Sequence, residues 1–317
     1  MRFDFIHCHG SGNDFPLIDA RAIVLSDAEW ASVARALADR AGPVGGDGLL
    51  LLGPGDAACA FAMSMRNADG SEAETCLNGL RCVARAGFAA LGGDAMPGTA
   101  RVRLKTSVAS VARTTLAEGV YGVRETAAPA SLDVAAWPMR VGVDRVIDAA
   151  IPALDPVRAF TAVAIPNPHL VTFVERVDEA ELVRLGTICE AAPDWLPNRA
   201  NVSFVEMRGA DLFVRTFERG VGLTDSCGSA MAASTYAACL TGRIAFDAEA
   251  TVFNRGGLVR ASAGADGVVT IVGNATWTYA GSVEVDLATG IASDLAITER
   301  FTDEGAAWER LKARQAA

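Results

Sequence analysis

The sequence predicts a mixed α and β protein built from two similar lobes. At 317 residues the chain is long for a single hydrophobic core, and its 51% hydrophobic content excludes an intrinsically disordered chain. Strand-like and helix-like segments follow one another in a similar order in both halves. Each half also carries a cysteine in a matched setting, Cys76 in the first half and Cys227 in the second. Two lobes are therefore favoured over one.

Two helices are predicted in the first half. Ser26 and Glu29 have the spacing of a capping box, and the alanine-rich helix that follows should stop near Gly42-Pro43. After Cys76 apolar residues recur at helical spacing until Gly92-Gly93, so a helix starts at or beside this cysteine. Strands are expected at residues 2–19, as a hairpin around a glycine-rich turn, and at 49–52, 59–66, 101–115 and 119–125.

The second half repeats this order. A helix of small residues begins at Cys227 and ends before Gly242. The stretch from Ala127 to Ala136 is the best candidate for a crossover between the lobes. Strands are expected at residues 170–174, 202–217 and 251–286, and further helices at residues 181–191 and 303–317.

The two cysteines have matched surroundings in the sequence. Asn67 precedes Cys76 by nine positions and Glu218 precedes Cys227 by nine, with a polar, glycine-containing turn between them in both halves. We expect each cysteine in the first turn of its helix, with the preceding hydroxyl residue as the N-cap. The two expected N-caps are Thr75 and Ser226.

A cysteine at a helix start is suited to acid–base chemistry. The helix N-terminus has partial positive charge and unpaired N–H donors, which stabilise a thiolate and also bind a carboxylate. Two such ends at one substrate would place a sulfur on each face of its α-carbon, as inversion of that carbon requires. Pyridoxal phosphate would need a Schiff-base lysine, and neither Lys105, in a predicted strand, nor Lys312, in the charged tail, has a suitable context. This pattern indicates cofactor-free chemistry.

Composition excludes several other classes of protein. A net charge of −10 without a basic cluster argues against nucleic acid and anionic lipid as partners. No stretch has the length of a bilayer-spanning helix, and Arg2 and Asp4 interrupt the apolar N-terminus. The seven cysteines show neither CxxC pairs nor zinc spacing with histidine, so no metal site is expected. We expect free thiols in a soluble, cytoplasmic protein.

Seven short stretches together resemble one known family. They are His9–Phe15, Asn67–Glu72, Cys76–Cys82, Asn167–His169, Asn201, Glu218–Gly220 and Cys227–Ser229. In this order, and from residue 3 to about residue 283, they resemble the diaminopimelate epimerases. The resemblance implies an α+β fold of two pseudo-symmetric lobes, each a mostly antiparallel curved β-sheet or barrel wrapped around a central α-helix, with the active site between the lobes.

The resemblance also implies domain boundaries. The N-terminal lobe would span residues 1–128 and receive a return strand near residues 275–290. The C-terminal lobe would span residues 129–274. Residues 291–317 would form a C-terminal helical extension.

Site residues follow from the same resemblance, position by position. Cys76 and Cys227 would be the acid–base pair, and His169 and Glu218 would orient or polarise the groups around the thiols. The carboxylate at the reacting centre would meet the backbone of two helix starts. These helix starts are Asn78-Gly79 and Gly228-Ser229, and the remaining ammonium and carboxylate groups would be held by Asn13, Asn67, Asn167, Asn201 and Arg219.

The implied function is a pyridoxal-independent epimerase that interconverts LL- and meso-diaminopimelate, for lysine and peptidoglycan precursor synthesis. Its partner would be this small amino acid, and a homodimer stays open. Some positions depart from the family. Leu77 replaces a glycine, Gly48 replaces a polar residue, Leu223 and Asp225 alter the loop before Cys227, and about thirty residues after Ser282 exceed the usual family end.

Three alternatives stay open at this point. The departures above keep open a racemase or epimerase of the same fold that acts on a different amino acid. A thiol redox protein would cycle Cys76 and Cys227 between thiols and a disulfide, and a non-catalytic binding protein would retain an amino acid without proton exchange. The other five cysteines are expected to be small core residues, namely Cys8, Cys59, Cys82, Cys189 and Cys239.

Overall fold

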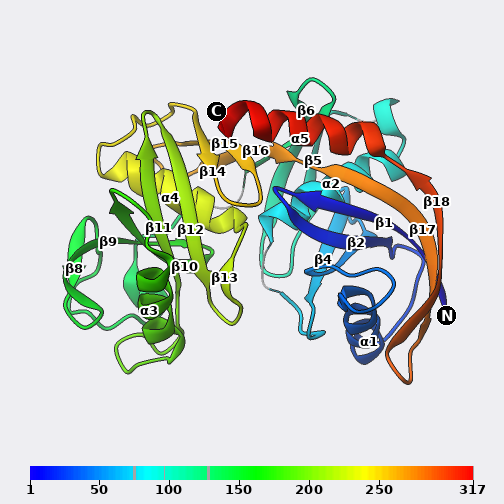
Figure 1. Cartoon of the computed structure of the whole chain (residues 1–317), viewed down its shortest axis with the longest axis horizontal. Coiled ribbons are helices and arrows are strands. Elements are labelled where there is room, and N and C mark those ends of the chain that lie inside the picture. The colour runs from blue at the N-terminus through cyan, green and yellow to red at the C-terminus, as the bar shows by residue number, and fades with distance from the viewer. Residues whose placement is uncertain (74–75, 96, 127–128, 317) are drawn as a thin grey trace. The chain divides into compact units, whose positions relative to one another are not determined.

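The computed structural model describes residues 1–73, 76–95, 97–126 and 129–316, and it divides into two compact units (Figure 1). Unit 1 comprises Met1–Glu125 and Val272–Ala317, and unit 2 comprises Thr126–Ile271. The boundary between the units thus follows Glu125. The resemblance implies a lobe boundary after residue 128. The expected crossover begins at residues 127–128, which lie outside the described residues.

Unit 1 contains a chain of paired strands with helices between them. In order its elements are β1 (Arg2–Gly10), β2 (Asn13–Asp19), α1 (Asp27–Ala38), β3 (Gly48–Pro54), β4 (Phe61–Asn67), α2 (Leu77–Ala90), η1 (Gly93–Ala95), β5 (Thr99–Arg103), β6 (Val108–Ala117), β7 (Val120–Thr126), β17 (Thr276–Asp286), β18 (Ile291–Arg300) and α5 (Thr302–Ala316). From β1 to β6 successive strands pair antiparallel, parallel, antiparallel, parallel and antiparallel. β17 pairs with β1 on one side and β18 on the other.

Unit 2 repeats this order. Its elements are η2 (Val134–Ala136), β8 (Ala149–Ile151), β9 (Asp155–Ile165), β10 (Asn167–Val174), α3 (Glu179–Glu190), β11 (Asn201–Arg208), β12 (Asp211–Glu218), β13 (Gly222–Thr224), α4 (Gly228–Leu240), β14 (Ala250–Phe253) and β15 (Leu258–Ala263), and β16 (Val269–Asn274) returns the chain to unit 1. As in unit 1, strand pairing alternates between antiparallel and parallel. The pairs in order are β9–β10, β10–β11, β11–β12, β12–β14 and β14–β15. The internal repeat predicted from the cysteine spacing is therefore present in the topology.

Each unit wraps its strands around one buried helix. In unit 1 α2 contacts β1 to β4 and β6, and in unit 2 α4 contacts β9 to β12, β14 and β15. Every α4 residue from Gly228 to Cys239 is buried. Small residues allow this close approach: a Cβ on Gly87 of α2 would lie 2.7 Å from the Phe61 ring. The predicted arrangement of strands around a central helix is confirmed in both units.

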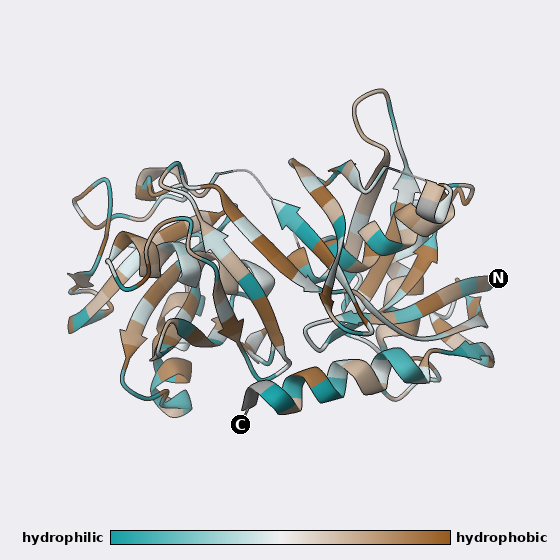
Figure 2. Ribbon diagram, turned by 90° about the horizontal axis from the view of Figure 1, so that it is seen from above, coloured by the Kyte–Doolittle hydropathy of each residue, from teal (hydrophilic) through white to brown (hydrophobic). Residues whose placement is uncertain are grey.

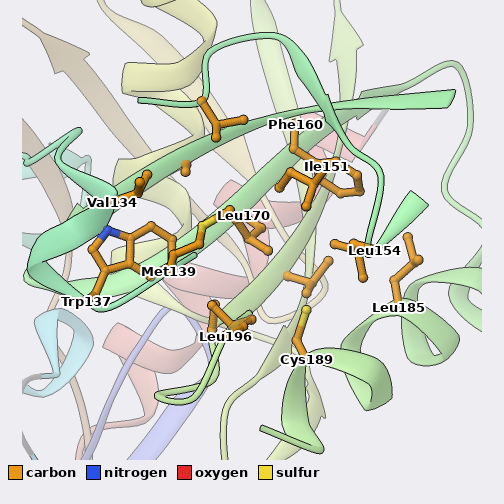
Figure 3. Close-up of a cluster of buried hydrophobic side chains, with 14 of the residues drawn as sticks. Val134, Trp137, Met139, Ile151, Leu154, Phe160, Leu170, Leu185, Cys189 and Leu196 are labelled. Carbon is orange, nitrogen blue, oxygen red and sulfur yellow. The ribbon is translucent and has the colours of Figure 1, made fainter. Parts of the chain in front are cut away.

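A second helix in each unit covers an outer hydrophobic cluster. The predicted capping box of α1 is present, because Ser26 accepts a hydrogen bond from the Glu29 N–H while the Glu29 carboxylate accepts one from Ser26. The cluster in unit 2 joins Leu185 and Cys189 of α3 to Phe160 and Leu170 of the strands (Figure 3). Cys189 is a core residue as predicted, and so are the buried Cys8, Cys59, Cys82 and Cys239.

The C-terminal segment differs from the expected helical extension over residues 291–317. Residues 291–300 form strand β18, which pairs with β17 through a tight turn whose Gly290 has a φ of +68°. Only α5 is helical, and it lies along β17 (Figure 1). Hydrophilic and apolar residues alternate along α5, as expected of a helix with one face packed on a sheet (Figure 2). Among the described residues, none of the helices combines the length and the apolarity needed to cross a bilayer.

Candidate active site

Both cysteines predicted to be catalytic stand at the start of a central helix. Cys76 is the N-cap of α2 and Cys227 is the N-cap of α4, each in an extended backbone conformation. The expected hydroxyl N-caps are therefore wrong for Ser226, which accepts a hydrogen bond from Asn254 instead, at 3.0 Å. Thr75 lies outside the described residues. Each cysteine was expected in the first turn of its helix, and it instead occupies the N-cap position, just before the first helical residue.

In unit 1 the thiol of Cys76 lies among three of the predicted substrate-binding residues. Its Sγ accepts a hydrogen bond from the Gly79 N–H at 3.2 Å and contacts Asn13 Oδ1 at 3.8 Å. The Asn78 amide donates to the same Asn13 oxygen at 3.3 Å. Gly79 lies in a closely packed place, because a Cβ there would lie 2.7 Å from Leu50 Cδ2. We call Cys76, Asn13, Asn78 and Gly79 the first half-site.

An ionic network that the sequence did not reveal holds Asn13. Its amide donates to Asp47 at 2.5 Å. Arg40 pairs with both Asp14 and Asp47, at 2.6 and 2.7 Å. Hydrogen bonding to the Arg40 guanidinium and its positive charge outweigh burial and hold the pKa of Asp14 below its usual range. The Asp14 carboxylate therefore stays charged, and these contacts fix the turn that carries Asn13.

A buried ion pair holds Asn78. Arg81 is fully buried; it donates to Asn78 Oδ1 at 2.6 Å and to Glu125 at 2.7 Å. It also donates to Ser11 Oγ and to the Asn274 carbonyl. Burial raises the pKa of Glu125 to about 7, against the opposing effect of the Arg81 charge. No local pattern predicts these contacts, since Arg81 and Asn274 are 193 positions apart.

Asn67 has a different setting from the other unit 1 residues. It ends β4, and its side-chain amide donates to Ser71 Oγ at 2.9 Å within the same turn. Its N–H also bonds the Ser71 carbonyl. These contacts are those of a turn residue that satisfies its local backbone.

In unit 2 Cys227 is buried and acid–base coupled to Glu218. Burial, and then the negative charge of Glu218, raise the pKa of the Cys227 thiol well above its usual value. Thr224 donates to the Glu218 carboxylate at 2.5 Å and so fixes its position. The Cys227 sulfur also lies 3.5 Å from Ser229 Oγ. At neutral pH Cys227 is a protonated thiol next to an anchored carboxylate.

His169 and the asparagines of unit 2 converge on the start of α4. His169 Nε2 lies 3.1 Å from Ser229 Oγ, and the Asn167 amide donates to the same oxygen at 3.2 Å. Asn201 lies beside the His169 ring, at 3.4 Å from Nε2. Burial, and then the positive charge of Arg219, lower the pKa of His169 to about 3, so the ring is neutral. We define the second half-site by eight residues, namely Asn167, His169, Asn201, Glu218, Arg219, Cys227, Gly228 and Ser229.

Two further polar atoms of the second half-site are the backbone nitrogen of Arg219 and the side-chain oxygen of Asn167. The Arg219 N–H donates to Asn201 Oδ1 at 2.8 Å, which ties the Glu218-Arg219 turn to β11. Asn167 Oδ1 is buried and has no hydrogen-bond partner among the described residues. A buried acceptor without a partner is costly, so it is suited to receive a donor from a ligand.

The departures from the family pattern have structural explanations. Gly48 is required by the approach of β3 to β4, because a Cβ there would lie 2.3 Å from the Arg66 carbonyl oxygen. Leu77 is buried in unit 1, with 5% of its surface exposed. Asp225 pairs with the buried Arg215 at 3.1 Å.

No cluster of three or more His, Cys, Asp or Glu side chains in the described ranges is arranged to hold a metal. Lys105 lies between β5 and β6, outside the strands, and pairs with Glu72 at 2.7 Å. Lys312 pairs with Glu309 on α5, also at 2.7 Å. Both lysine amines are thus engaged by carboxylates, away from the two half-sites.

Sequence comparison places these half-sites in a known family. The family model for diaminopimelate epimerase matches residues 161–278. A diaminopimelate epimerase of Enterococcus faecalis is 39% identical over 92% of this chain and 92% of its own length, and one of Clostridium acetobutylicum is 37% identical over 90% and 87%. One of Listeria welshimeri covers 97% of this chain at 35% identity, so the relatives share at least part of the segment after Ser282 that the sequence analysis placed beyond the family end.

The fold is similar to those of solved structures of an epimerase and a PhzF-family protein. A hydroxyproline epimerase from Agrobacterium vitis superposes with a TM-score of 0.64 at 14% identity, over 90% of this chain and 92% of that one. A PhzF-family protein of Bacillus anthracis superposes with a TM-score of 0.62 at 14% identity, over 90% of this chain and all of that one. The sequence relatives, with a third or more of their residues identical over nearly the whole chain, show that this protein belongs to the diaminopimelate epimerase family.

Proposed function

We propose that this protein interconverts LL- and meso-diaminopimelate without a cofactor, with one of the Cys76 and Cys227 thiols removing the α-proton and the other delivering a proton to the opposite face of the α-carbon. The observation that carries the proposal is the repeated N-cap position of these two cysteines on the buried helices α2 and α4. Family membership supports the substrate, because the relatives are named for it. Since inversion exchanges the two faces of one carbon, both thiols must reach the same α-carbon.

The roles of the thiols follow from their surroundings. Cys227 enters the reaction as the acid, because burial and the Glu218 charge raise its pKa and keep it protonated. Cys76 is then the base that removes the α-proton in that direction, and the roles exchange in the reverse direction. Backbone N–H groups in the first turns of α2 and α4 bind the substrate carboxylate and stabilise the negative charge that develops on it.

The second half-site supplies polar groups for the substrate. The neutral His169 and the amide of Asn167 hold Ser229 Oγ, beside Cys227. Asn167 Oδ1 is free to accept a hydrogen bond from a substrate ammonium group. A ligand without a donor at this position would leave a buried acceptor unpaired, which disfavours its binding.

A reducing location fits this chemistry. All seven cysteines are free thiols, and the mechanism needs Cys76 and Cys227 in that state. We therefore infer that the protein acts in the cytoplasm, on a free amino acid.

The experiment is incubation of the reduced protein with LL-diaminopimelate in deuterated water, with α-proton exchange followed by NMR and stereochemistry by chiral chromatography. Deuterium incorporation together with the meso isomer supports the proposal. A fully reduced protein that exchanges no α-proton would reject this substrate, and the same assay with other amino acids would then test the same-fold alternative.

Cysteine variants assign the exchange to the two thiols. Cys76→Ala and Cys227→Ala should each lose epimerisation by about three orders of magnitude, since each removes one proton carrier. Matched controls lie on the same helices: Cys82→Ala on α2 and Cys239→Ala on α4 remove buried thiols away from the helix starts. Full activity in either N-cap variant would contradict the two-thiol mechanism.

A further inference from the structure

The C-terminal helix α5 is anchored to α2, the helix that carries Asn78 and Gly79 of the first half-site, and it also contacts His9 of β1. Arg85 of α2 makes a bidentate ion pair with Glu304 of α5, at 2.5 and 2.7 Å. The Arg85 guanidinium also lies 3.9 Å from the centre of the Trp277 ring. Such a paired, partly buried Arg–carboxylate contact holds geometry better than an exposed ion pair. α5 is therefore fixed to the helix that begins at Cys76.

Trp308 of α5 contacts the strand that leads to Asn13. This tryptophan is 2% exposed, and its ring centre lies 5.7 Å from that of His9 at the end of β1. Lys312, one turn later on α5, lies 5.9 Å from the Trp308 ring. The Trp308 ring thus packs against the His9 imidazole, which is partly buried.

His9 in turn holds the glycine-rich turn closed. Its Nδ1 accepts a hydrogen bond from the Gly12 N–H at 3.3 Å and lies 3.3 Å from the Asn274 amide. Both contacts require an unprotonated Nδ1. Burial, and then the Lys312 charge, lower the pKa of His9 to about 4, so the ring is neutral at pH 7. Asn274 also accepts from the Ser11 N–H at 2.7 Å.

The turn ends at Asn13, whose side chain contacts the Cys76 thiol and the Asn78 amide. We propose that Trp308 is a positioning residue: by covering His9 it fixes the turn of residues 9–12 and thereby holds Asn13 against Cys76. This inference rests on the proposed function of Cys76 as an acid–base residue. It gives the C-terminal helix a part in catalysis without contact with the substrate.

The test compares Trp308→Ala with Leu311→Ala, a control that shortens a partly buried side chain of the same helix. Trp308→Ala should lower kcat by about 10–100-fold, because a shift of about 1 Å in a catalytic group has effects of this size, and should leave KM little changed. Leu311→Ala should keep the wild-type kcat. Trp308→Phe, which retains an aromatic cover on His9, should recover most of the lost kcat.

A second readout separates positioning from loss of fold. Peptide mapping after brief iodoacetamide treatment should show a changed alkylation rate at Cys76 in Trp308→Ala, while the buried Cys82 on the same helix stays protected. If circular dichroism shows that Trp308→Ala is unfolded, Trp308→Leu, which fills more of the space, takes its place. A kcat and a Cys76 alkylation rate equal to those of Leu311→Ala would overturn the inference. Absence of exchange in the wild-type protein would reject the proposed function instead, and the alkylation rates would still decide the role of Trp308.

Discussion

The imidazole Nε2 of His169 lies 3.1 Å from the hydroxyl oxygen of Ser229, which links the start of β10 to the first turn of α4. Ser229 Oγ in turn lies 3.5 Å from the Cys227 sulfur. The thiol, the hydroxyl and the imidazole thus form one buried series of polar groups. Because water is excluded from it, the protonation states of His169 and Cys227 are set by their neighbours in the fold.

Burial of the neutral His169 predicts a loss of stability in acid. Its pKa is about 3 in the folded protein and near 6.5 in the unfolded chain, so below pH 6.5 the unfolded chain binds a proton that the folded protein does not. The free energy of unfolding should therefore decrease as the pH is lowered below 6.5, by about 1.4 kcal/mol per pH unit for this residue. Urea unfolding at pH 7, 6 and 5 should show a shallower dependence in His169→Gln. An unchanged dependence would show that His169 is not buried as a neutral ring.

Removal of the Glu218 charge should make Cys227 more reactive while catalysis falls. Glu218→Gln deletes the negative charge that raises the pKa of this thiol, so a larger fraction is thiolate at a given pH. In a Cys76→Ala background, iodoacetamide should alkylate Cys227 faster in Glu218→Gln than in the parent. Glu249→Gln, an exposed residue of the same unit, serves as the control. Slower alkylation after the Glu218 change would contradict the assigned contact.

The buried pair of Arg81 and Glu125 should matter more to stability than any exposed pair. Arg81→Met leaves Glu125 buried without its partner and should cost about 3–5 kcal/mol of unfolding free energy. Arg21→Met breaks an exposed pair with Asp19 and should cost less than about 1 kcal/mol. Urea unfolding measures both. Equal costs would mean that the Arg81 network does not support the first half-site as described.

The sequence predicted the features that depend on local patterns. The internal repeat, the capping box at Ser26 and the cysteine-led helices all have short-range signals, and the structure contains each of them. Strand β18 was missed because its residues are mostly exposed and lack the alternation of a half-buried strand.

The supporting contacts of the first half-site could not be read from the sequence. Asn13 and Asp47 are 34 positions apart, and Arg81 meets Glu125 and Asn274 only after the strands pair. The N-cap prediction was wrong by one residue in unit 2, where Cys227 is the N-cap and Ser226 is engaged by Asn254, 28 positions along the chain. Tertiary contacts decide these positions, and a single sequence carries no local record of them.

The isotope content of the first meso-diaminopimelate formed in deuterated water tests the two-thiol mechanism most directly. One thiol removes the substrate proton while the other delivers a deuteron that it has already taken from solvent. We therefore predict that the earliest meso product carries deuterium at the inverted carbon while the remaining LL substrate is still protonated. Early meso product that keeps the substrate proton would show that a single base returns it, and would contradict the account.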